Sequence, residues 1–165
     1  MKRFLTLLLL LLPFISNAQD GWTCELLPPD PLFDQKEPRN QYIYEDAQGI
    51  LTIFTTQEEG RTPIEVYVEC KEGAFRSGAI YDQSLIIGFY DEHKNYLKKE
   101  EIMPFSFARG THNAISIPSD TRENLLEHLR NGGYVRFYAR KEGTRHAFDF
   151  VVPKINVPTK PGFNL

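Results

Sequence analysis

The sequence predicts a mostly β protein: an antiparallel β-sandwich, jelly-roll-like, with one short α-helix near residues 120–131. Two observations lead to this fold class. From residue 41 onward, short segments with apolar residues at every second position are separated by turn residues, a pattern typical of strands. Only one segment has helical spacing, and helices do not alternate with strands as they do in parallel α/β folds.

The first strands are predicted from alternation and from turn chemistry. Residues 42–45 and 50–55 flank the turn segment 46–49, which ends in glycine and favours a hairpin. Residues 64–70 alternate cleanly, so Val66, Val68 and Cys70 are expected to share the core face. Further strands are predicted over residues 74–81, 84–90, 102–108 and 114–117.

The helix is predicted from its two ends and from its apolar face. Ser119 or Asp120 is the expected N-cap, and Asp120 with Glu123 resembles a capping box. The segment 131–133, Asn-Gly-Gly, is expected to end the helix because these residues tolerate positive φ. The apolar face is formed by Leu125, Leu126 and Leu129.

Two strands are expected after the helix, over residues 134–140 and 145–152. In the first of them, alternate residues are apolar and the residues between them are aromatic or basic. Tyrosine and arginine are enriched at the energetic centres of protein interfaces. The four outward-facing residues of this strand are therefore a candidate binding strip, although an ordinary solvated sheet face has the same composition. The strip consists of Tyr134, Arg136, Tyr138 and Arg140.

The first eighteen residues have the pattern of a cleavable signal peptide. Lys2 and Arg3 precede an apolar run over 4–15, and small residues at Ser16 and Ala18 mark a cleavage site after Ala18. The run is shorter than the roughly 20 residues that span a bilayer. We therefore expect a periplasmic or secreted protein that is not integral to the membrane.

Proline and acidic residues dominate residues 19–40, which we expect to form an extended arm outside a single domain over 41–155. A flexible tail is expected over 156–165. Cys24 and Cys70 are expected to form a disulfide in an oxidising compartment, worth roughly 3–4 kcal/mol on the chain-entropy model. Two buried free thiols, or an intermolecular bond, are the alternatives.

The charge balance argues against nucleic acid as a partner. The chain has 19 basic and 22 acidic residues, and removal of Lys2 and Arg3 with the leader changes the net charge from −3 to −5. Binding to phosphates requires a basic surface. The partner is therefore expected to be a protein or a component of the cell envelope, and the sequence does not indicate an oligomeric state.

No catalytic or metal signature stands out. The four histidines have no metal-ligand spacing, and the segment 91–93, Asp-Glu-His, is explained by a charged turn. No nucleophile motif of a hydrolase is present. Neither a metal nor a cofactor is expected, while a glycosidase-type carboxylate pair stays open because such pairs have no fixed spacing.

From residue 64 onward the order of features resembles that of small secreted bacterial β-sandwich proteins, the invasion-associated locus B family and the VasI-like accessory proteins of type VI secretion. The shared features are a strand that ends in cysteine (66–70), a strand before an acidic turn (88–91), the helix (124–129), a basic-aromatic strand (134–137) and a final strand (147–150). The resemblance implies a non-catalytic role in surface assembly or host contact.

The expected function is that of an exported, non-catalytic binding or structural module that uses a sheet face. Two alternatives remain at this stage: a small secreted hydrolase acting on glycans, and a β-barrel carrier of a small apolar ligand.

Overall fold

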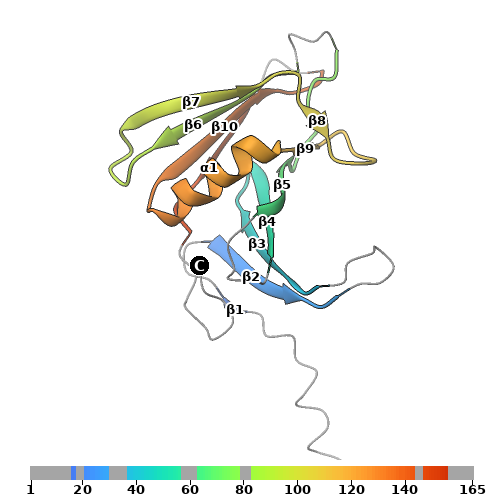
Figure 1. The fold of residues 1–165 in the computed structure, drawn as a ribbon. Helices are drawn as coiled ribbons and strands as arrows, with labels where there is room; N and C mark the ends of the chain where they lie inside the picture. The colour runs from blue at the N-terminus through green and yellow to red at the C-terminus, as the bar shows by residue number, and fades with distance from the viewer. Residues whose placement is uncertain are drawn as a thin grey trace, which may run out of the picture.

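Two antiparallel sheets and one helix make up the fold (Figure 1). The computed structural model describes residues 16–17, 21–29, 37–56, 63–78, 83–143 and 147–155 of the 165-residue chain. The predicted class, mostly β with antiparallel sheets arranged as in a sandwich and one short helix, is confirmed.

The larger sheet is built mainly from consecutive hairpins of the first half of the chain. Its strands pair in an order that keeps chain neighbours adjacent up to β5, after which the short strands β9 and β8 complete the sheet. Across the sheet the strands are β1 (Ser16–Asn17), β2 (Trp22–Leu27), β3 (Arg39–Glu45), β4 (Gly49–Thr56), β5 (Pro63–Cys70), β9 (Ala114–Ser116) and β8 (Ser106–Phe107).

The smaller sheet joins two hairpins that are separated in the sequence by β8, β9 and the helix. Strand β10 pairs with β6, which places the last hairpin beside the earlier one. Across the sheet the strands are β11 (Ala147–Val152), β10 (Tyr134–Arg140), β6 (Leu85–Tyr90) and β7 (Tyr96–Ile102).

The core lies between the inner faces of the two sheets and is rich in aromatic rings. Tyr44 of the larger sheet contacts Phe150 of the smaller sheet, with 5.8 Å between ring centroids. Phe150 in turn stacks on Phe137 at 6.0 Å. Gly49 in β4 allows a close approach, because a Cβ there would lie 2.9 Å from the ring of Phe148. These contacts bury the apolar faces that drive folding.

Helix α1 (Ser119–Arg130) closes one side of the sandwich (Figure 1). Its buried face contacts β5 in one sheet and β10 in the other. The predicted N-cap and capping box are wrong: the N-cap position is held by Pro118, which makes no side-chain capping hydrogen bond, and among the described residues the Asp120 carboxylate accepts only from the adjacent N–H of Thr121. Pro118 is compatible with this position because it lacks an N–H and its φ is already fixed near −62°. Within the described residues, no helix is long and apolar enough to cross a membrane.

Most predicted strands are confirmed, but two predictions are wrong in part. Within the predicted strand over 74–81, the described residues form only an isolated bridge between Phe75 and Lys141. The predicted strand over 102–108 is not continuous: Ile102 is the last residue of β7, which the sequence did not predict, and pairing breaks after it. Pro104 has no N–H to donate to a sheet ladder, and pairing resumes only in the two-residue strand β8.

The N-terminal part of the predicted arm belongs to the larger sheet. Strand β2 pairs with β3 along its whole length, and Trp22 is fully buried. Strand β1 lies inside the predicted leader, so cleavage after Ala18 would leave six strands in this sheet. The cleavage site itself and the predicted tail over 156–165 lie outside the described residues.

The predicted disulfide is wrong: Cys24 and Cys70 are both free thiols, and both are buried. The sheet register explains why. Cys24 aligns through β3 and β4 with Val66 on β5, three strand spacings away, which is about 14 Å. Cys70 lies four residues further along β5, about 13 Å more. The separation far exceeds the roughly 7 Å limit for Cα atoms in a disulfide.

Thiol titration tests whether Cys24 and Cys70 are free thiols. Burial raises the pKa of the Cys24 thiol to about 12, so the reactive thiolate is scarce at neutral pH. We expect two free thiols in denaturant, slow reaction of both in the folded protein, and the same thermal midpoint with and without reductant. Absence of free thiols, or a lower midpoint after reduction, would contradict the structure.

Candidate functional site

Strand β10 exposes the residues of the predicted strip on one face of the smaller sheet. Its side chains alternate strictly between buried and outward positions along all seven residues. Val135, Phe137 and Ala139 are buried, whereas Tyr134 is half-buried and Arg136, Tyr138 and Arg140 are exposed. The structure therefore brings the four predicted residues together on the outer face.

Exposed apolar side chains gather on this same sheet. The register places Val151 of β11 beside Arg136, and Ile86 of β6 beside Tyr138. Tyr138 is 43% exposed and Val151 is 45% exposed. Among the described residues, six large hydrophobic side chains are exposed. Four of them lie on β7, β10 and β11 of this sheet: Tyr96, Leu97, Tyr138 and Val151.

A shallow hollow of about 280 Å³ lies at one end of this face. It spans β6, β10, β11 and the turn between β6 and β7. The register pairs Tyr134 with Tyr90, which sets two aromatic side chains side by side at the ends of their strands. We call it the tyrosine hollow; its lining residues are Tyr90, Lys94, Tyr134, Arg136 and Val151.

Arg136 is held in the tyrosine hollow by a two-point ion pair across the strands. Its Nε donates to Oδ1 of Asp149 at 2.7 Å and its Nη2 donates to Oδ2 at 2.5 Å. This pairing raises the pKa of the guanidinium, with a smaller contribution from Tyr90. Both partners are about half exposed, so the pair fixes geometry more than it adds stability.

Lys94 reaches the tyrosine hollow from the turn between β6 and β7. The Asp91 carboxylate organises this turn, because it accepts hydrogen bonds from the backbone of His93 and from the backbone and side chain of Asn95. Lys94 has φ +65°, a conformation that few residues other than glycine and asparagine adopt readily. Its Nζ lies 5.5 Å from the ring centroid of Tyr134. Within the described part of the chain, Nζ has no carboxylate partner within 4 Å.

His128 supports the backbone beneath the tyrosine hollow. Its Nε2 lies 2.8 Å from the carbonyl oxygen of Tyr90 and 3.2 Å from that of Tyr134. Because both partners are carbonyls, Nε2 carries the hydrogen and donates it. The imidazole also packs edge-on against Phe89, with 5.1 Å between ring centroids. The last turn of α1 thus ties together the strand ends that line the hollow.

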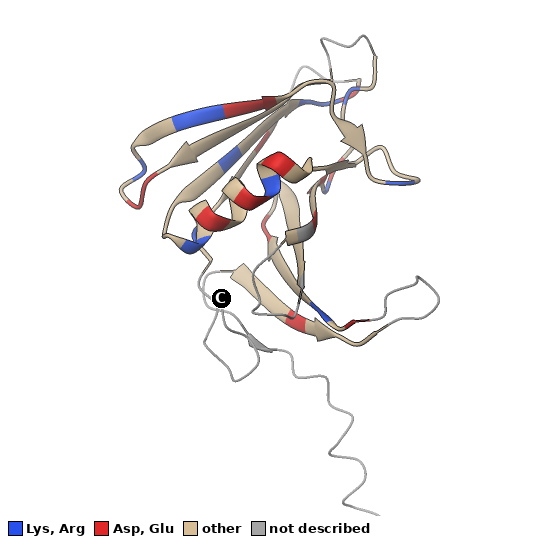
Figure 2. Ribbon diagram, in the orientation of Figure 1, with Lys and Arg blue, Asp and Glu red and all other residues tan. Residues whose placement is uncertain are grey.

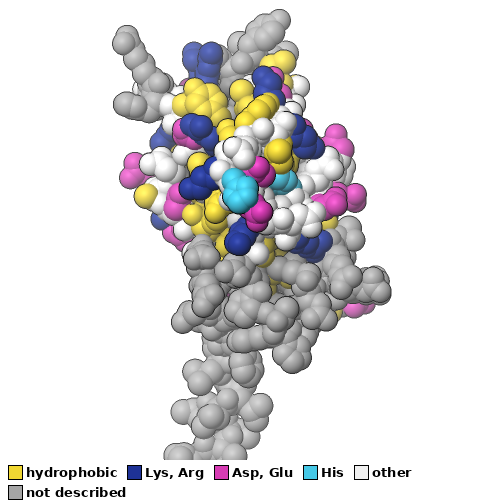
Figure 3. Space-filling model, turned by 90° about the vertical axis from the view of Figure 1, so that its left-hand side faces the viewer, with side chains coloured by type: hydrophobic (Ala, Val, Ile, Leu, Met, Phe, Trp, Pro, Cys, Tyr) yellow, Lys and Arg dark blue, Asp and Glu magenta, His cyan; other side chains and the backbone are white. Residues whose placement is uncertain are grey.

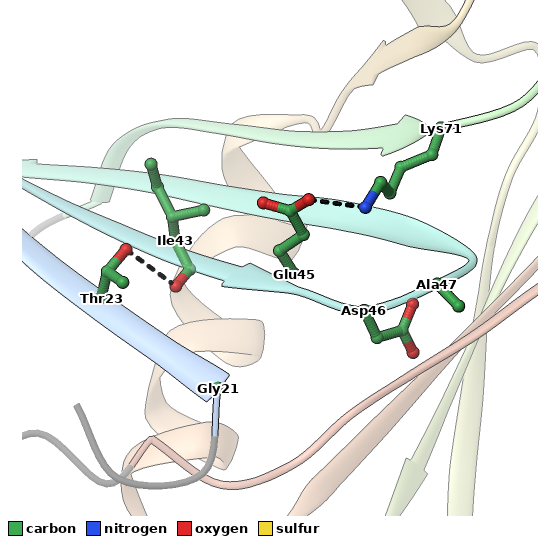
Figure 4. Close-up of a pocket in the computed structure, with 7 residues that line it drawn as sticks. All are labelled: Gly21, Thr23, Ile43, Glu45, Asp46, Ala47 and Lys71. Carbon is green, nitrogen blue, oxygen red and sulfur yellow. Dashed lines mark hydrogen bonds and ion pairs between the residues drawn. The ribbon is translucent and has the colours of Figure 1, made fainter. Parts of the chain in front are cut away.

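A second hollow, of about 370 Å³, lies beside the β3–β4 turn on the larger sheet (Figure 4). Its charged groups are already engaged with other parts of the protein. The Nζ of Lys71 lies 2.6 Å from Oε1 of Glu45. The Asp46 carboxylate accepts hydrogen bonds from the N–H groups of Gln48 and Gly49 and so closes the turn. This hollow therefore has fewer unoccupied polar groups than the tyrosine hollow.

The charge on the smaller sheet is mixed rather than uniform. Figure 2 shows basic and acidic segments next to each other along β7. In the view onto the left-hand side of Figure 1, hydrophobic, basic and acidic side chains are interleaved (Figure 3). A partner that binds this surface is therefore recognised through the positions of individual side chains, not through a broad electrostatic potential of one sign.

Sequence reasoning found the strip but missed the other residues of the tyrosine hollow. Tyr90, Lys94 and Val151 come from three separate segments, and only the strand register brings them to Tyr134 and Arg136. The sequence of residues 91–93 predicts only a charged turn. The positive φ of Lys94 has no sequence signal of the kind that glycine provides.

Comparisons of the chain with protein-family models, with curated proteins and with solved structures find no match. The resemblance to the invasion-associated locus B and VasI-like proteins therefore gains no support and stays a prediction.

Substitution of Gly133 tests the support beneath the tyrosine hollow. A Cβ at Gly133 would lie 2.1 Å from Nε2 of His128, so Gly133→Ala displaces the imidazole. We expect a loss of about 1–3 kcal/mol in the free energy of unfolding, measured by denaturant titration. The same substitution is expected to cost less in a His128→Ala background. Equal costs in both backgrounds would contradict the proposed contact.

The turn that holds Lys94 makes a prediction about pH. Hydrogen bonds from Asn95, and then from His93, hold the pKa of the Asp91 carboxyl below its ordinary value. The folded turn is thus favoured above the ordinary carboxyl pKa, and this contribution is lost as the pH falls through the lowered value. In an NMR titration, we expect Asn95→Ala to raise the Asp91 pKa. An unchanged pKa would show that the Asn95 side chain does not stabilise the carboxylate.

Proposed function

We propose that this protein is an exported, non-catalytic binding module that contacts a protein or an envelope component through the outer face of its smaller sheet. The resemblance to secreted bacterial β-sandwich proteins and the signal-peptide pattern support the location outside the cytoplasm. The surface on which the proposal rests is formed by the strip and the tyrosine hollow.

One observation carries the proposal: the concentration of exposed apolar side chains on the same face as arginine and tyrosine. Tyr138 and Val151 are each more than 40% exposed, and they flank the Arg136–Asp149 ion pair. Exposed apolar residues beside tyrosine and arginine are typical of the energetic centre of an interface.

The two alternative functions fit the geometry less well. A carrier of an apolar ligand in a β-barrel needs a closed sheet, whereas the two sheets are separate and open. A glycan hydrolase needs a carboxylic acid that can give up a proton at the scissile bond. In the two described hollows, the carboxylates of Asp149 and Glu45 are in ion pairs and that of Asp46 closes a turn. The binding function is therefore preferred.

The test is retention of a partner from an envelope extract by immobilised protein. The variant Tyr138→Ala with Val151→Thr truncates one exposed apolar side chain and makes the other polar, without changing a core residue. We expect at least one partner that the wild type retains and that this variant loses.

The matched control is Leu26→Ala, because Leu26 is also 43% exposed but lies on β2 of the larger sheet. The control is expected to retain the same partner as the wild type. All variants are first compared by circular dichroism and thermal unfolding. Retention of every partner by the folded double variant would exclude this face as the binding site.

A further inference from the structure

We propose that the tyrosine hollow binds a carboxylate side chain from an acidic segment of a partner protein, with Lys94 as its charge partner. This inference rests on the proposed binding function and names the chemistry that the site recognises. It concerns the end of the smaller sheet at which β6, β10 and the β6–β7 turn meet.

Two charged side chains line the hollow, Lys94 and Arg136, and only Arg136 has an ion-pair partner among the described residues. Arg136 is neutralised by both oxygens of Asp149. Asp91 and Glu92 carry negative charges in the adjoining turn, but the Asp91 carboxylate is held by N–H groups of the turn and Glu92 is exposed and lies 3.6 Å from His93. Lys94 therefore presents its ammonium group to an incoming ligand, and a carboxylate is its complement.

The position of Lys94 is fixed by the fold before any ligand arrives. The Asp91 carboxylate holds the turn at both the backbone and the side chain of Asn95. The ammonium group then lies above the Tyr134 ring, where a cation gains from the ring's negative face. A preorganised cation loses less side-chain entropy on binding than a free surface lysine does. Lys94 itself adopts a positive φ of 65° within this turn.

The lining favours an acidic peptide segment over a neutral glycan. The ionic groups that face the hollow are cationic, and the Asp149 carboxylate is occupied by Arg136. A glycan needs acceptors for its many hydroxyl donors, whereas a carboxylate needs donors only. Apolar contact is available next to the cation, because Val151 lines the same hollow and Tyr138 lies further along β10. A peptide in which an acidic residue is followed by apolar residues is complementary to this arrangement, in which a cation lies next to apolar side chains.

The experiment is a binding titration with a synthetic peptide of alternating glutamate and leucine. The protein is expressed from the full chain and used as the expression host processes it. Amide chemical shifts in NMR spectra report both the affinity and the location. We expect saturable binding that weakens with added salt and that shifts the signals of Lys94, Tyr134 and Arg136. A peptide with lysine in place of glutamate is expected not to bind.

The decisive variant is Lys94→Asn, because asparagine removes the charge and tolerates positive φ. Its matched control is Arg109→Asn, which removes one positive charge from the exposed β8–β9 loop. Lys94→Asn is expected to weaken peptide binding about three- to fivefold, as for one exposed ion pair, while Arg109→Asn leaves it unchanged.

Equal binding by both variants, absence of peptide binding, or binding of a galacturonate trimer in place of the peptide would each overturn this inference. These results differ from a failure of the binding function itself. If the Tyr138 and Val151 variant still loses its partner, the sheet face remains a binding site and only the acidic ligand is excluded.

Discussion

The alternation of side chains along β10 connects the core of this protein to its candidate binding surface. Val135, Phe137 and Ala139 must face inward, because they pack against a core that contains the Phe150 ring. Since side chains of a strand alternate between its two faces, burial of these three forces the residues between them into solvent. A one-residue slip in register would bury Arg136 and expose Phe137, so the same hydrophobic burial that stabilises the fold also fixes the surface.

The tyrosine hollow depends on contacts that cross the whole domain. The Nε2 of His128, on α1, bonds to carbonyls at the ends of β6 and β10, and the Asp91 carboxylate shapes the turn that follows β6. The ion pair between Arg136 and Asp149 joins β10 to β11 on the outer face. Helix, turn and sheet therefore each hold one part of the hollow, which explains how an open sheet face can present fixed side chains.

The sequence is informative where burial is periodic and uninformative where it is not. Strand β10 is predicted to the residue because its inner and outer residues differ in polarity. Strand β7 was missed because most of its residues are exposed on both faces, which leaves no alternating pattern. The disulfide prediction failed because the distance between Cys24 and Cys70 depends on strand order, which composition and spacing do not contain. The tyrosine hollow could not be predicted from the sequence for the same reason, because strand order and register bring its residues together.

The edge strand β7 gives a physical reason why the face, rather than the edge, of the smaller sheet is suited to a partner. Lys98 and Glu100 pair with Phe89 and Ile87, so they point toward the inner side of an edge strand. The Nζ of Lys98 lies 2.8 Å from Oε1 of Glu100 and 4.7 Å from the centroid of the Phe89 ring. Inward-pointing charges discourage another strand from extending the sheet, because the added strand would desolvate them. Association through the outer face leaves these charges in water and uses the apolar side chains that the sheet exposes.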